Sequence, residues 1–523
     1  MSRYSPPEQL NLADYYLADR LREGLGERIA LRLPEENLTY REVEALACRF
    51  AHALRERGVR REERVLVALP DGAEFVGALF GVLKLGAVVV MLNPDLSREE
   101  AAGQIAYVRP TLAVVSPAGF ALYSALIEEK GEAPGLENGL LVAGDGEHPA
   151  AWQRLAPEDA DFPAVATHRD DAAIWLFSGG TTGRPKAVVQ PHRSFANTTE
   201  LYAKNTLGYR ADDVTLSVPK LYFGYATGSN LFFPFSVGAS CVLFPEPPTP
   251  ELLFRQIARY RPTVMINVPT LLQRMVDFPG AAGQDLSSLR CITSAGEALP
   301  PSLYQRFFEL FGVELLDGLG TAEMWHIFLT NRPGEVHPGT LGRAVEGFEI
   351  SARDEEGKIL PAGEVGRLWV KGDSRAHYYW QNHEKTVEAF RGEYFVGGDL
   401  IRIDVAGVVT YCGRADDVFK VAGRWLVPAE VEDCLLQHPE VAECAVIGAA
   451  GADGLIKPYA FVLAKQGAAA PAGLDESLKA FALEKLAAYK HPRRVLVLDT
   501  FPRTHLGKVD RGALRARLKE ALV

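Results

Sequence analysis

Residues 75–94 read FVGALFGVLKLGAVVVMLNP, and this stretch decides between a membrane protein and a layered globular fold. Its length and apolar character approach those of a membrane-spanning helix, which needs about 20 apolar residues. Lys84 interrupts the apolar run, however, and Gly86 divides it into a helical half and a β-branched half that ends at Asn93 and Pro94. We interpret the stretch as a buried helix, a turn and a buried strand. A membrane span is the alternative, which Lys84 and Gly86 disfavour.

The alternation of helix and strand continues on both sides of this stretch. Residues 38–58 have apolar residues at helical spacing, with Thr39 placed to cap the helix and Gly58 at its end, and the strand RVLVALP follows. Further short apolar runs, mostly separated by helical stretches, are LAVVS, AAIWLF, ASCVLF, PTVMINVP and RCITSAG. Continuous apolar strands between helices are typical of parallel sheets covered on both faces, which predicts an α/β fold.

From about residue 340 the strands become shorter and turns more frequent. Residues 348–372 are predicted to form a β-meander, and residues 407–436 to lead from a hairpin into a helix. The segments VAECAVIGAA, KPYAFVLAKQG, LDESLKAFALEKL and RRVLVLD are then predicted to run β, α, β and α. We expect a large N-terminal domain, residues 1–415, of layered, parallel-rich sheets and helices with a β-rich subdomain. A small mobile α+β domain, residues 416–523, should follow it.

Composition restricts the class of protein and its partners. The chain has 523 residues, more than one hydrophobic core usually supports. Its formal net charge of −11 argues against broad binding to nucleic acid or to an anionic membrane, so small molecules are the expected partners. The six cysteines form no C-x-x-C pair, and the N-terminus lacks the apolar region of a secretory signal. Both observations favour a cytoplasmic enzyme with reduced thiols, for which a homodimer is an ordinary expectation.

The stretch SGGTTGRPK, residues 178–186, has the composition of a phosphate-binding loop. It is not a Walker A motif, because two residues separate Gly183 from Lys186 and Ala187 follows the lysine. Glycine lets the backbone approach a phosphate closely, and the amides and hydroxyls of such a turn can donate to its oxygens. From this stretch alone, a surface turn is the alternative. The residues expected to contact phosphate are Ser178, Gly179, Gly180, Thr181, Thr182 and Lys186.

Four further motifs follow the loop: LLDGLGTAEM, YFVGGDL, GRADDVFKVAG and PRTHLGKVDR. In this order and spacing, the five motifs resemble the signature set of the acyl-adenylate-forming superfamily, which includes acyl-CoA ligases, peptide-synthetase adenylation domains and firefly-type luciferases. The resemblance runs from about Leu38 to the C-terminus, and residues 220–239 and 317–349 are most similar to the benzoate-CoA ligase group. It implies that a carboxylate attacks the α-phosphorus of Mg-ATP to give acyl-AMP and pyrophosphate, and that a thiol then attacks the acyl-AMP.

The resemblance also implies roles for residues of the nucleotide site. Glu323 matches a glutamate that binds Mg²⁺, an ion that prefers hard oxygen ligands. Asp317 matches a residue that accepts from the adenine amino group, Asp399 one that accepts from both ribose hydroxyls, and Arg414 one that contacts the nucleotide. Without the surrounding motifs, each carboxylate could be a solvated charge or a helix cap. Two further residues complete the ATP-binding set, Gly318 and Thr321.

Lys508 matches a mobile lysine that bridges the substrate carboxylate and the α-phosphate; outside this motif it would read as a surface charge. Because Lys508 lies in the small domain, that domain must close over the large one for adenylation. The resemblance implies a rotation about a hinge at Asp416, which withdraws the lysine and presents another loop to the acyl-AMP and the pantetheine tunnel. The residues implied at that tunnel are Ala422, Gly423 and Trp425.

Three positions depart from the superfamily pattern. Ala322 stands where a threonine commonly precedes the glutamate, and the loss of one phosphate-facing hydroxyl is worth about 1 to 2 kcal/mol. Trp425 stands where acetate-activating members have an arginine, which puts that contact to the CoA phosphate in doubt, although an aromatic residue there resembles aryl-CoA ligases. Gly397 stands where many relatives carry threonine.

The residues expected to line the acyl pocket are Phe223, Gly224, Tyr225, Gly320, His326 and Ile327. In acetate-activating relatives a tryptophan at the place of Gly320 closes the pocket, so glycine leaves room for a ring. The stretch YFGYATGS has no carboxylate to pair with a substrate ammonium, which disfavours amino acids. The remaining lining is apolar and aromatic. His326 could contact a polar group on the ring; the alternative is a core histidine bonded to the backbone.

We therefore predict a cytoplasmic aryl-CoA ligase that uses ATP, Mg²⁺ and coenzyme A and prefers benzoate. A hydroxybenzoate, an aminobenzoate or another acyl acid is an alternative substrate. Two other activities share these motifs: the loading of an aryl acid onto a separate carrier protein, and a luciferase-like monooxygenation. A non-catalytic relative is disfavoured because the charged residues of all five motifs are present, namely Lys186, Glu323, Asp399, Arg414 and Lys508.

Overall fold

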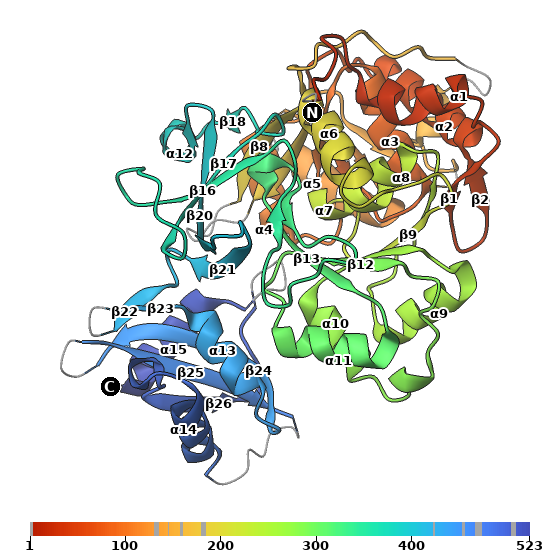
Figure 1. Ribbon diagram of the computed structural model, residues 1–523. Helices are drawn as coiled ribbons and strands as arrows, with labels where there is room; N and C mark the ends of the chain where they lie inside the picture. The colour runs from red at the N-terminus through yellow and green to blue at the C-terminus, as the bar shows by residue number, and fades with distance from the viewer. Residues whose placement is uncertain are drawn as a thin grey trace.

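The structure is a computed structural model. It describes residues 4–129, 135–144, 146–156, 161–178, 185–421, 424–451, 455–465, 473–503 and 509–522. In Figure 1 the red to green part of the chain forms sheets with helices packed around them, and the blue C-terminal part forms its own group of strands and helices.

The predicted buried helix, turn and strand form as expected. Helix α3 is Ala73–Lys84 and strand β4 is Val88–Met91, and every residue of β4 is buried. Lys84 Nζ donates to Glu44 Oε1 at 2.5 Å and to the Phe162 carbonyl at 3.1 Å. These contacts account for the buried ammonium, which would be costly without a partner. None of the described helices has the length and apolar content that a membrane span requires.

Strand β4 belongs to a seven-stranded sheet. Its other strands are β3 (Arg64–Ala68), β5 (Leu112–Val115), β6 (Leu140–Val142), β7 (Ala172–Ser178), β8 (Lys186–Pro191) and β18 (Tyr378–Tyr379). The order is β18-β8-β7-β4-β3-β5-β6. From β7 to β6 the neighbours are parallel, whereas β8 and β18 add antiparallel pairs at one edge.

A nine-stranded sheet forms the second layer. Its strands are β1 (Ile29–Arg32), β2 (Asn37–Thr39), β9 (Val214–Ser217), β10 (Ser240–Val242), β11 (Val264–Asn267), β12 (Cys291–Ser294), β13 (Leu315–Gly320), β14 (Ile327–Thr330) and β15 (Arg343–Ala344). The order is β15-β14-β13-β12-β11-β9-β10-β1-β2, and the central pairs from β13 to β1 are parallel. All the short apolar runs singled out in the sequence are strands of these two sheets, so the predicted α/β fold is confirmed.

The helices connect and cover the sheets. Besides α3 they are α1 (Asp19–Arg22), α2 (Tyr40–Glu56), α4 (Arg98–Val108), α5 (Pro117–Glu128), α6 (His192–Thr198), α7 (Gly224–Thr227), α8 (Phe233–Phe235), α9 (Pro250–Tyr260), α10 (Pro269–Val276), α11 (Pro301–Phe311), α12 (His383–Ala389), α13 (Pro428–Leu436), α14 (Leu474–Lys485) and α15 (Arg511–Leu522). The predicted cap of α2 is confirmed, since Thr39 Oγ1 accepts from Glu42 N at 3.2 Å and Glu42 Oε2 accepts from Thr39 N at 2.7 Å.

Residues 348–372, predicted to form a β-meander, contain the antiparallel strands β16 (Glu349–Arg353) and β17 (Val365–Lys371). The structure adds β19 (Phe390–Arg391), β20 (Tyr394–Ile403) and β21 (Val409–Arg414) to the same antiparallel sheet, which has five strands. The C-terminal strands are β22 (Phe419–Val421), β23 (Arg424–Leu426), β24 (Val441–Ala450), β25 (Ile456–Ala464) and β26 (Arg494–Leu498). The predicted order β, α, β, α is wrong, because β24 and β25 follow one another as an antiparallel pair before α14.

The apolar cores divide along the chain. One cluster joins α2 and α3 to both large sheets and reaches the five-stranded sheet at Leu368 and Val370. Two clusters within the C-terminal part contain only residues between Val421 and Leu518. A separate core is what an independently folding unit needs. The domain boundary at Asp416 and the mobility of the small domain stay predictions.

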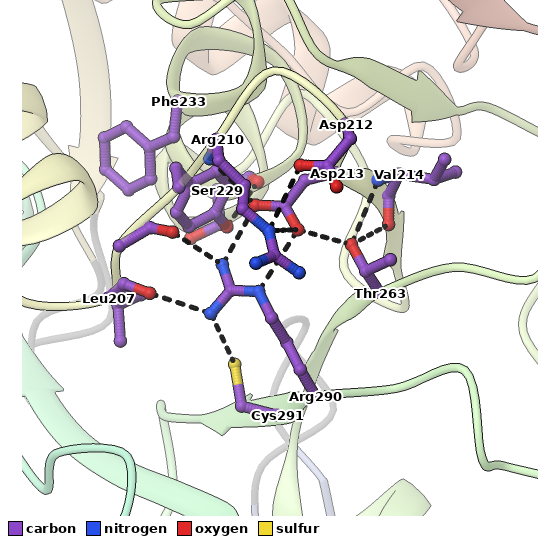
Figure 2. Close-up of polar contacts among 12 residues, drawn as sticks. Leu207, Arg210, Asp212, Asp213, Val214, Ser229, Phe233, Thr263, Arg290 and Cys291 are labelled. Atoms are coloured by element: carbon purple, nitrogen blue, oxygen red, sulfur yellow. Dashed lines mark hydrogen bonds and ion pairs between the residues drawn. The ribbon is translucent and has the colours of Figure 1, made fainter.

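An ionic cluster around the buried Asp213 connects the amino ends of three parallel strands (Figure 2). The Arg290 guanidinium, just before β12, donates to both oxygens of Asp213, just before β9, at 3.1 and 3.0 Å. Thr263, just before β11, donates its hydroxyl to the same carboxylate at 2.7 Å. These contacts hold one end of the sheet. In open α/β sheets ligands bind at the opposite, carboxyl ends of the strands.

Candidate active site

The predicted phosphate loop connects the antiparallel strands β7 and β8, and Ser178 pairs directly with Lys186 across the hairpin. The Ser178 hydroxyl oxygen is buried and has no hydrogen-bond partner among the described residues. Lys186 Nζ lies 4.4 Å from the centre of the Tyr379 ring. The segment between Ser178 and Lys186 contains the other predicted phosphate ligands, which lie outside the described residues: Gly179, Gly180, Thr181 and Thr182.

Glu323 lies on a short 3-10 turn, Ala322–Met324, that follows β13. Its side chain is buried, and Oε1 accepts a hydrogen bond from the Tyr379 hydroxyl at 2.6 Å. Burial and the charge of Glu323 raise the pKa of Tyr379 well above its ordinary value, so this hydroxyl keeps its proton. Two hydrogen bonds hold the backbone of the turn. Gln190 Nε2 donates to the Ala322 carbonyl at 2.6 Å, and Ala376 N donates to the Glu323 carbonyl at 2.8 Å.

The backbone reverses directly after this turn. Trp325 has φ 61° and ψ −50°, and His326 N donates to the Met324 carbonyl at 2.8 Å. This is the positive-φ form of a γ-turn, which is rare and strained. The buried Trp325 ring is held by aromatic neighbours, among them Phe195 at 4.4 Å between ring centres. Strain of this kind persists only where the surroundings enforce it, and it is concentrated at functional sites.

Thr321 caps the turn that carries Glu323. Its hydroxyl oxygen accepts from Met324 N at 3.3 Å and caps the 3-10 turn. Many relatives have a threonine hydroxyl at position 322, where this chain has alanine. The Thr321 hydroxyl contacts the turn, and its predicted contact with ATP stays a prediction.

Asp317 lies in β13 opposite Ser294 of β12, and it is buried. Burial raises the pKa of Asp317 well above its ordinary value. Its Oδ1 has no hydrogen-bond partner in the described part of the chain. A buried acceptor without a donor costs about 1 to 3 kcal/mol, which a ligand N–H would relieve. Close packing requires glycine at position 318, because a Cβ there would lie 2.9 Å from the Leu329 carbonyl oxygen.

Asp399 and Arg414 are paired residues of the neighbouring strands β20 and β21. Asp399 is buried and accepts from the Tyr411 hydroxyl at 3.2 Å, and its Oδ1 lies 3.6 Å from Arg414 Nη1. A Cβ at Gly398 would lie 2.7 Å from Arg414 Nη2, so this glycine makes room for the guanidinium. The carboxylate predicted to accept from ribose and the predicted cation therefore lie together.

The predicted acyl residues Tyr225 and His326 contact one another through the backbone. The Tyr225 hydroxyl donates to Thr293 Oγ1 at 2.8 Å. Burial lowers the pKa of His326 to about 3, so the ring is neutral, and its Nε2 lies 3.1 Å from the Tyr225 carbonyl and 3.2 Å from Ser229 Oγ. Since a carbonyl can only accept, the proton belongs on Nε2. This is the core-histidine arrangement, and contact of His326 with the acyl group stays a prediction.

The glycines around His326 are required by close packing. A Cβ at Gly320 would lie 2.6 Å from the carbonyl carbon and oxygen of His326 and 2.8 Å from Ile327 N. A Cβ at Gly228 would lie 2.5 Å from His326 Cδ2. Gly320 is therefore needed by the backbone itself, besides any room that it leaves for a ring. The remaining predicted lining residues are Phe223 and Gly224 at the start of α7 and the buried Ile327 of β14.

The predicted hinge is bound to the last helix. Arg515 Nη2 donates to the Asp416 carbonyl at 3.1 Å and to Asp417 Oδ1 at 2.8 Å. Trp425 pairs through its backbone with Lys420 in the β22–β23 hairpin. Lys508, Ala422 and Gly423 lie outside the described residues.

Several residues that shape the site were not predicted from the sequence. Tyr379 and Tyr411 bind the two carboxylates, and Ser229 and Thr293 hold His326 and Tyr225. No local signal identifies them, because Tyr379, Ser229 and Thr293 contact residues more than 50 positions away, and Tyr411 contacts Asp399 only through the pairing of β20 with β21.

The donor set around Glu323 fits Mg²⁺. One carboxylate oxygen is occupied by Tyr379, and no described residue donates a hydrogen bond to the other. No group of three or more His, Cys, Asp or Glu that could hold a metal occurs among the described residues. Mg²⁺ is commonly held by one or two carboxylates together with substrate phosphates and water, so a single buried glutamate that contacts the same tyrosine as Lys186 suits it.

Comparison with known protein families decides the relationship. A family model described as AMP-binding enzyme matches residues 19–380, and a model described as AMP-binding enzyme C-terminal domain matches residues 430–508. The chain belongs to the AMP-binding enzyme family.

Similar members of this family can be compared along the whole chain. A benzoate–CoA ligase from Thauera aromatica is 39% identical over 98% of this chain and 96% of its own. The crystal structure of an anthranilate CoA ligase with anthranoyl-AMP is 37% identical, covers 100% of both chains and has a TM-score of 0.93. That of a benzoate CoA ligase from Burkholderia xenovorans LB400 is 39% identical, covers 97% of this chain and 100% of its own, and has a TM-score of 0.86.

These matches confirm the resemblance that the five motifs indicated. The chain is an AMP-forming acid–thiol ligase.

Proposed function

We propose that this AMP-binding enzyme is an aryl-CoA ligase that prefers benzoate and forms benzoyl-CoA, AMP and pyrophosphate. The observation that carries the proposal is the gathering of four predicted nucleotide-site residues around two tyrosines. Lys186 and Glu323 contact Tyr379, and Asp399 contacts Tyr411 and Arg414. The matches to benzoate and anthranilate ligases along the whole chain support an aromatic acid as the substrate.

In the first half-reaction, a benzoate oxygen attacks the α-phosphorus of ATP. The bond from that phosphorus to the oxygen of the β-phosphate breaks, and pyrophosphate leaves. Lys186 and Arg414 would stabilise the negative charge of the phosphates, and Asp317 and Asp399 would orient the nucleoside by accepting hydrogen bonds. Glu323 would hold Mg²⁺, which when bound neutralises phosphate charge.

In the second half-reaction, the CoA sulfur attacks the carbonyl carbon of benzoyl-AMP. The thiol loses its proton, the bond between carbonyl carbon and phosphate oxygen breaks, and AMP leaves. We propose that residues 416–523 turn about Asp416 between the two steps, so that Lys508 serves the first and the segment with Ala422, Gly423 and Trp425 serves the second.

The choice of an uncharged ring rests on the polar groups near α7. The Tyr225 hydroxyl is already engaged by Thr293, and the neutral His326 is bonded to the backbone. No described side chain of this group carries a charge that would pair with an ammonium or a second carboxylate. A ring without a charged substituent is therefore the best match.

The experiment is CoA-dependent AMP release with a panel of acids: benzoate, hydroxybenzoates, 2-aminobenzoate, cyclohexanecarboxylate and acetate. We expect the highest kcat/KM with benzoate. The kcat/KM for acetate should be at least about 100-fold lower, because acetate leaves a ring-sized pocket unfilled. A clear preference for a hydroxybenzoate or 2-aminobenzoate would replace benzoate as the substrate. AMP release that requires a carrier protein in place of CoA would overturn the ligase proposal. The cytoplasmic location and the homodimer stay predictions.

A further inference from the structure

Tyr379 joins two parts of the site that come from separate segments of the chain. Its hydroxyl donates to Glu323 Oε1 at 2.6 Å, and its ring lies 4.4 Å below Lys186 Nζ. Glu323 belongs to the turn after β13 of the nine-stranded sheet, whereas Lys186 begins β8 of the seven-stranded sheet. One buried side chain thus contacts both the candidate metal ligand and the lysine of the phosphate loop.

The position of Tyr379 is fixed by its surroundings. Its backbone pairs with Val188 in the β18–β8 ladder, and its amide donates to Thr386 Oγ1 at 3.1 Å. Its ring packs against Phe390 at 5.4 Å between ring centres, and the residue is 3% exposed. A side chain held in this way can act as a rigid support for its more polar neighbours.

The hydroxyl contact also restricts the orientation of the carboxylate. Because Oε1 of Glu323 accepts from Tyr379, the carboxylate cannot rotate freely, and Oε2 is the oxygen that this hydrogen bond leaves fully available to an ion. The backbone contact from Ala376, three residues before Tyr379, holds the main chain of Glu323 at 2.8 Å. Contacts of this type orient metal ligands and influence metal affinity by about 10- to 100-fold.

We propose that Tyr379 is a positioning residue that orients Glu323 for Mg²⁺ through its hydroxyl and supports Lys186 through its ring. The inference rests on the proposed function in that Mg-ATP is taken as the ligand of this site. The two roles are separable, because Tyr379→Phe removes only the hydroxyl and Tyr379→Leu removes the hydroxyl and the ring. Tyr378→Phe is the matched control, since Tyr378 is the adjacent residue of β18 and is 41% exposed.

The test measures binding and does not require turnover. Calorimetry gives the affinity of each variant for α,β-methylene-ATP with Mn²⁺ and with EDTA, and the ratio of the two is the gain due to the metal. We expect Tyr379→Phe to reduce this gain about 10-fold while its affinity in EDTA stays near that of the wild type. Tyr379→Leu should also weaken binding in EDTA, because Lys186 loses its support. Tyr378→Phe should match the wild type in both.

A double variant separates positioning from a general loss of structure. Glu323→Gln should lower the gain at least as much as Tyr379→Phe, and combining the two should lower it no further, because the tyrosine acts through the glutamate. In adenylation assays Tyr379→Phe should raise the Mg²⁺ concentration needed for half-maximal rate, and high Mg²⁺ should restore kcat.

An unchanged gain in Tyr379→Phe would overturn the inference. If both affinities are also unchanged, the hydroxyl has no role in binding, and if both fall equally, its role is merely structural. If the wild type itself shows no gain from metal and releases no AMP with any acid, the proposed function fails instead. Circular dichroism and thermal unfolding of each variant establish that it is folded.

Discussion

At the scale of single residues, the candidate site contains polar groups that have no hydrogen-bond partner in the described part of the chain. The Ser178 hydroxyl, Asp317 Oδ1 and His326 Nδ1 are buried without a hydrogen-bond partner among the described residues. Such groups reduce stability unless a ligand or water satisfies them. These three groups lie at the end of β7, within β13 and in the segment after β13, where the motifs placed the nucleotide and acyl sites.

Gly320 provides a residue-scale prediction. Gly320→Ala should lower the free energy of unfolding by about 1 to 3 kcal/mol, because the added Cβ would lie 2.6 Å from the His326 carbonyl and the backbone would have to shift. The kcat/KM of this variant for benzoate should also fall, because the same backbone shift would move predicted acyl-pocket residues. Urea unfolding and steady-state kinetics measure the two effects.

Gly103→Ala is the control for this variant, because a Cβ at Gly103 of α4 meets nothing within 4 Å. It should be as stable as the wild type or slightly more so. If Gly320→Ala instead keeps full stability and only shifts preference toward smaller acids, the glycine serves the pocket alone.

At the scale of elements, the sequence predicted most strands, because long apolar runs between helices have few alternative structures. It placed β4, β7 and β11 correctly, but it did not predict that β8 pairs with β7 after the predicted phosphate loop. It failed where local pattern is ambiguous: β25 was taken for a helix, since a buried apolar run does not identify its own period. The reversal at Trp325 could not be foreseen, because tertiary packing enforces a dihedral angle that tryptophan disfavours.

The same limit applies to the site. Motifs identified the charged residues that are predicted to contact the nucleotide, but they gave no information on the tyrosines that bind two of these residues. Tyr379 and Tyr411 come from strands that reach the site only through sheet topology. The partner of Tyr379 is 56 residues away in sequence and that of Tyr411 lies on the neighbouring strand, so no local pattern marks either tyrosine. The roles of Glu323 and Asp399 at the nucleotide stay predictions.

The ionic cluster of Figure 2 gives an element-scale prediction. Arg290→Met should lower the free energy of unfolding by about 3 to 5 kcal/mol, because it leaves the fully buried Asp213 carboxylate without its main partner. Arg210→Met should cost less than about 1 kcal/mol, since the Arg210 side chain is 61% exposed. Chemical unfolding measures both. Equal stabilities of the two variants would contradict the assignment of the cluster to the sheet's stability.

Asp71 gives a prediction of pH dependence. It precedes α3, is buried, and accepts from Leu221 N at 2.8 Å, and burial raises its pKa from 3.8 to about 7. Between pH 3.8 and about 7, the Asp71 carboxyl therefore holds its proton in the folded state and loses it in the unfolded state. Stability that depends on Asp71 is present below pH 4 and is lost as pH rises toward 7.

The comparison of wild type with Asp71→Asn isolates this effect, since asparagine keeps the acceptor and does not titrate. The free energy of unfolding of the wild type, relative to the variant, should fall by at most about 4 kcal/mol between pH 4 and pH 8. Urea unfolding at intervals of pH provides the measurement. A difference that does not change with pH would show that Asp71 is charged in the folded state.

At the scale of the whole molecule, the site residues are divided between two parts of the chain with separate cores. The predicted phosphate loop, the carboxylates and the predicted acyl residues precede the predicted hinge at Asp416, whereas Lys508 follows it. Arg515 binds the Asp416 carbonyl and Asp417, so the segment just after the predicted pivot is attached to α15. Motion of the C-terminal part as one unit is therefore expected to begin at or before Asp416.

Lys508→Ala tests this division of labour. We expect benzoate-dependent pyrophosphate exchange to fall at least about 100-fold, because the lysine is proposed to act on the developing charge of the first half-reaction. Transfer of a supplied benzoyl group from benzoyl-AMP to CoA should stay within about threefold of the wild type, since the other orientation of the small domain does not use this lysine. Equal loss of both half-reactions would contradict the assignment.

The strained turn at Trp325 has a consequence for how this scaffold could be diversified. Glu323 and His326 flank the turn, so a mutation that reshapes the chain at His326 would also displace the residue proposed to hold the metal. Tyr225 and its neighbours on α7 reach His326 from another segment and do not pass through the turn. Directed evolution toward new acids should therefore find tolerated changes in α7 far more often than in the segment around Trp325.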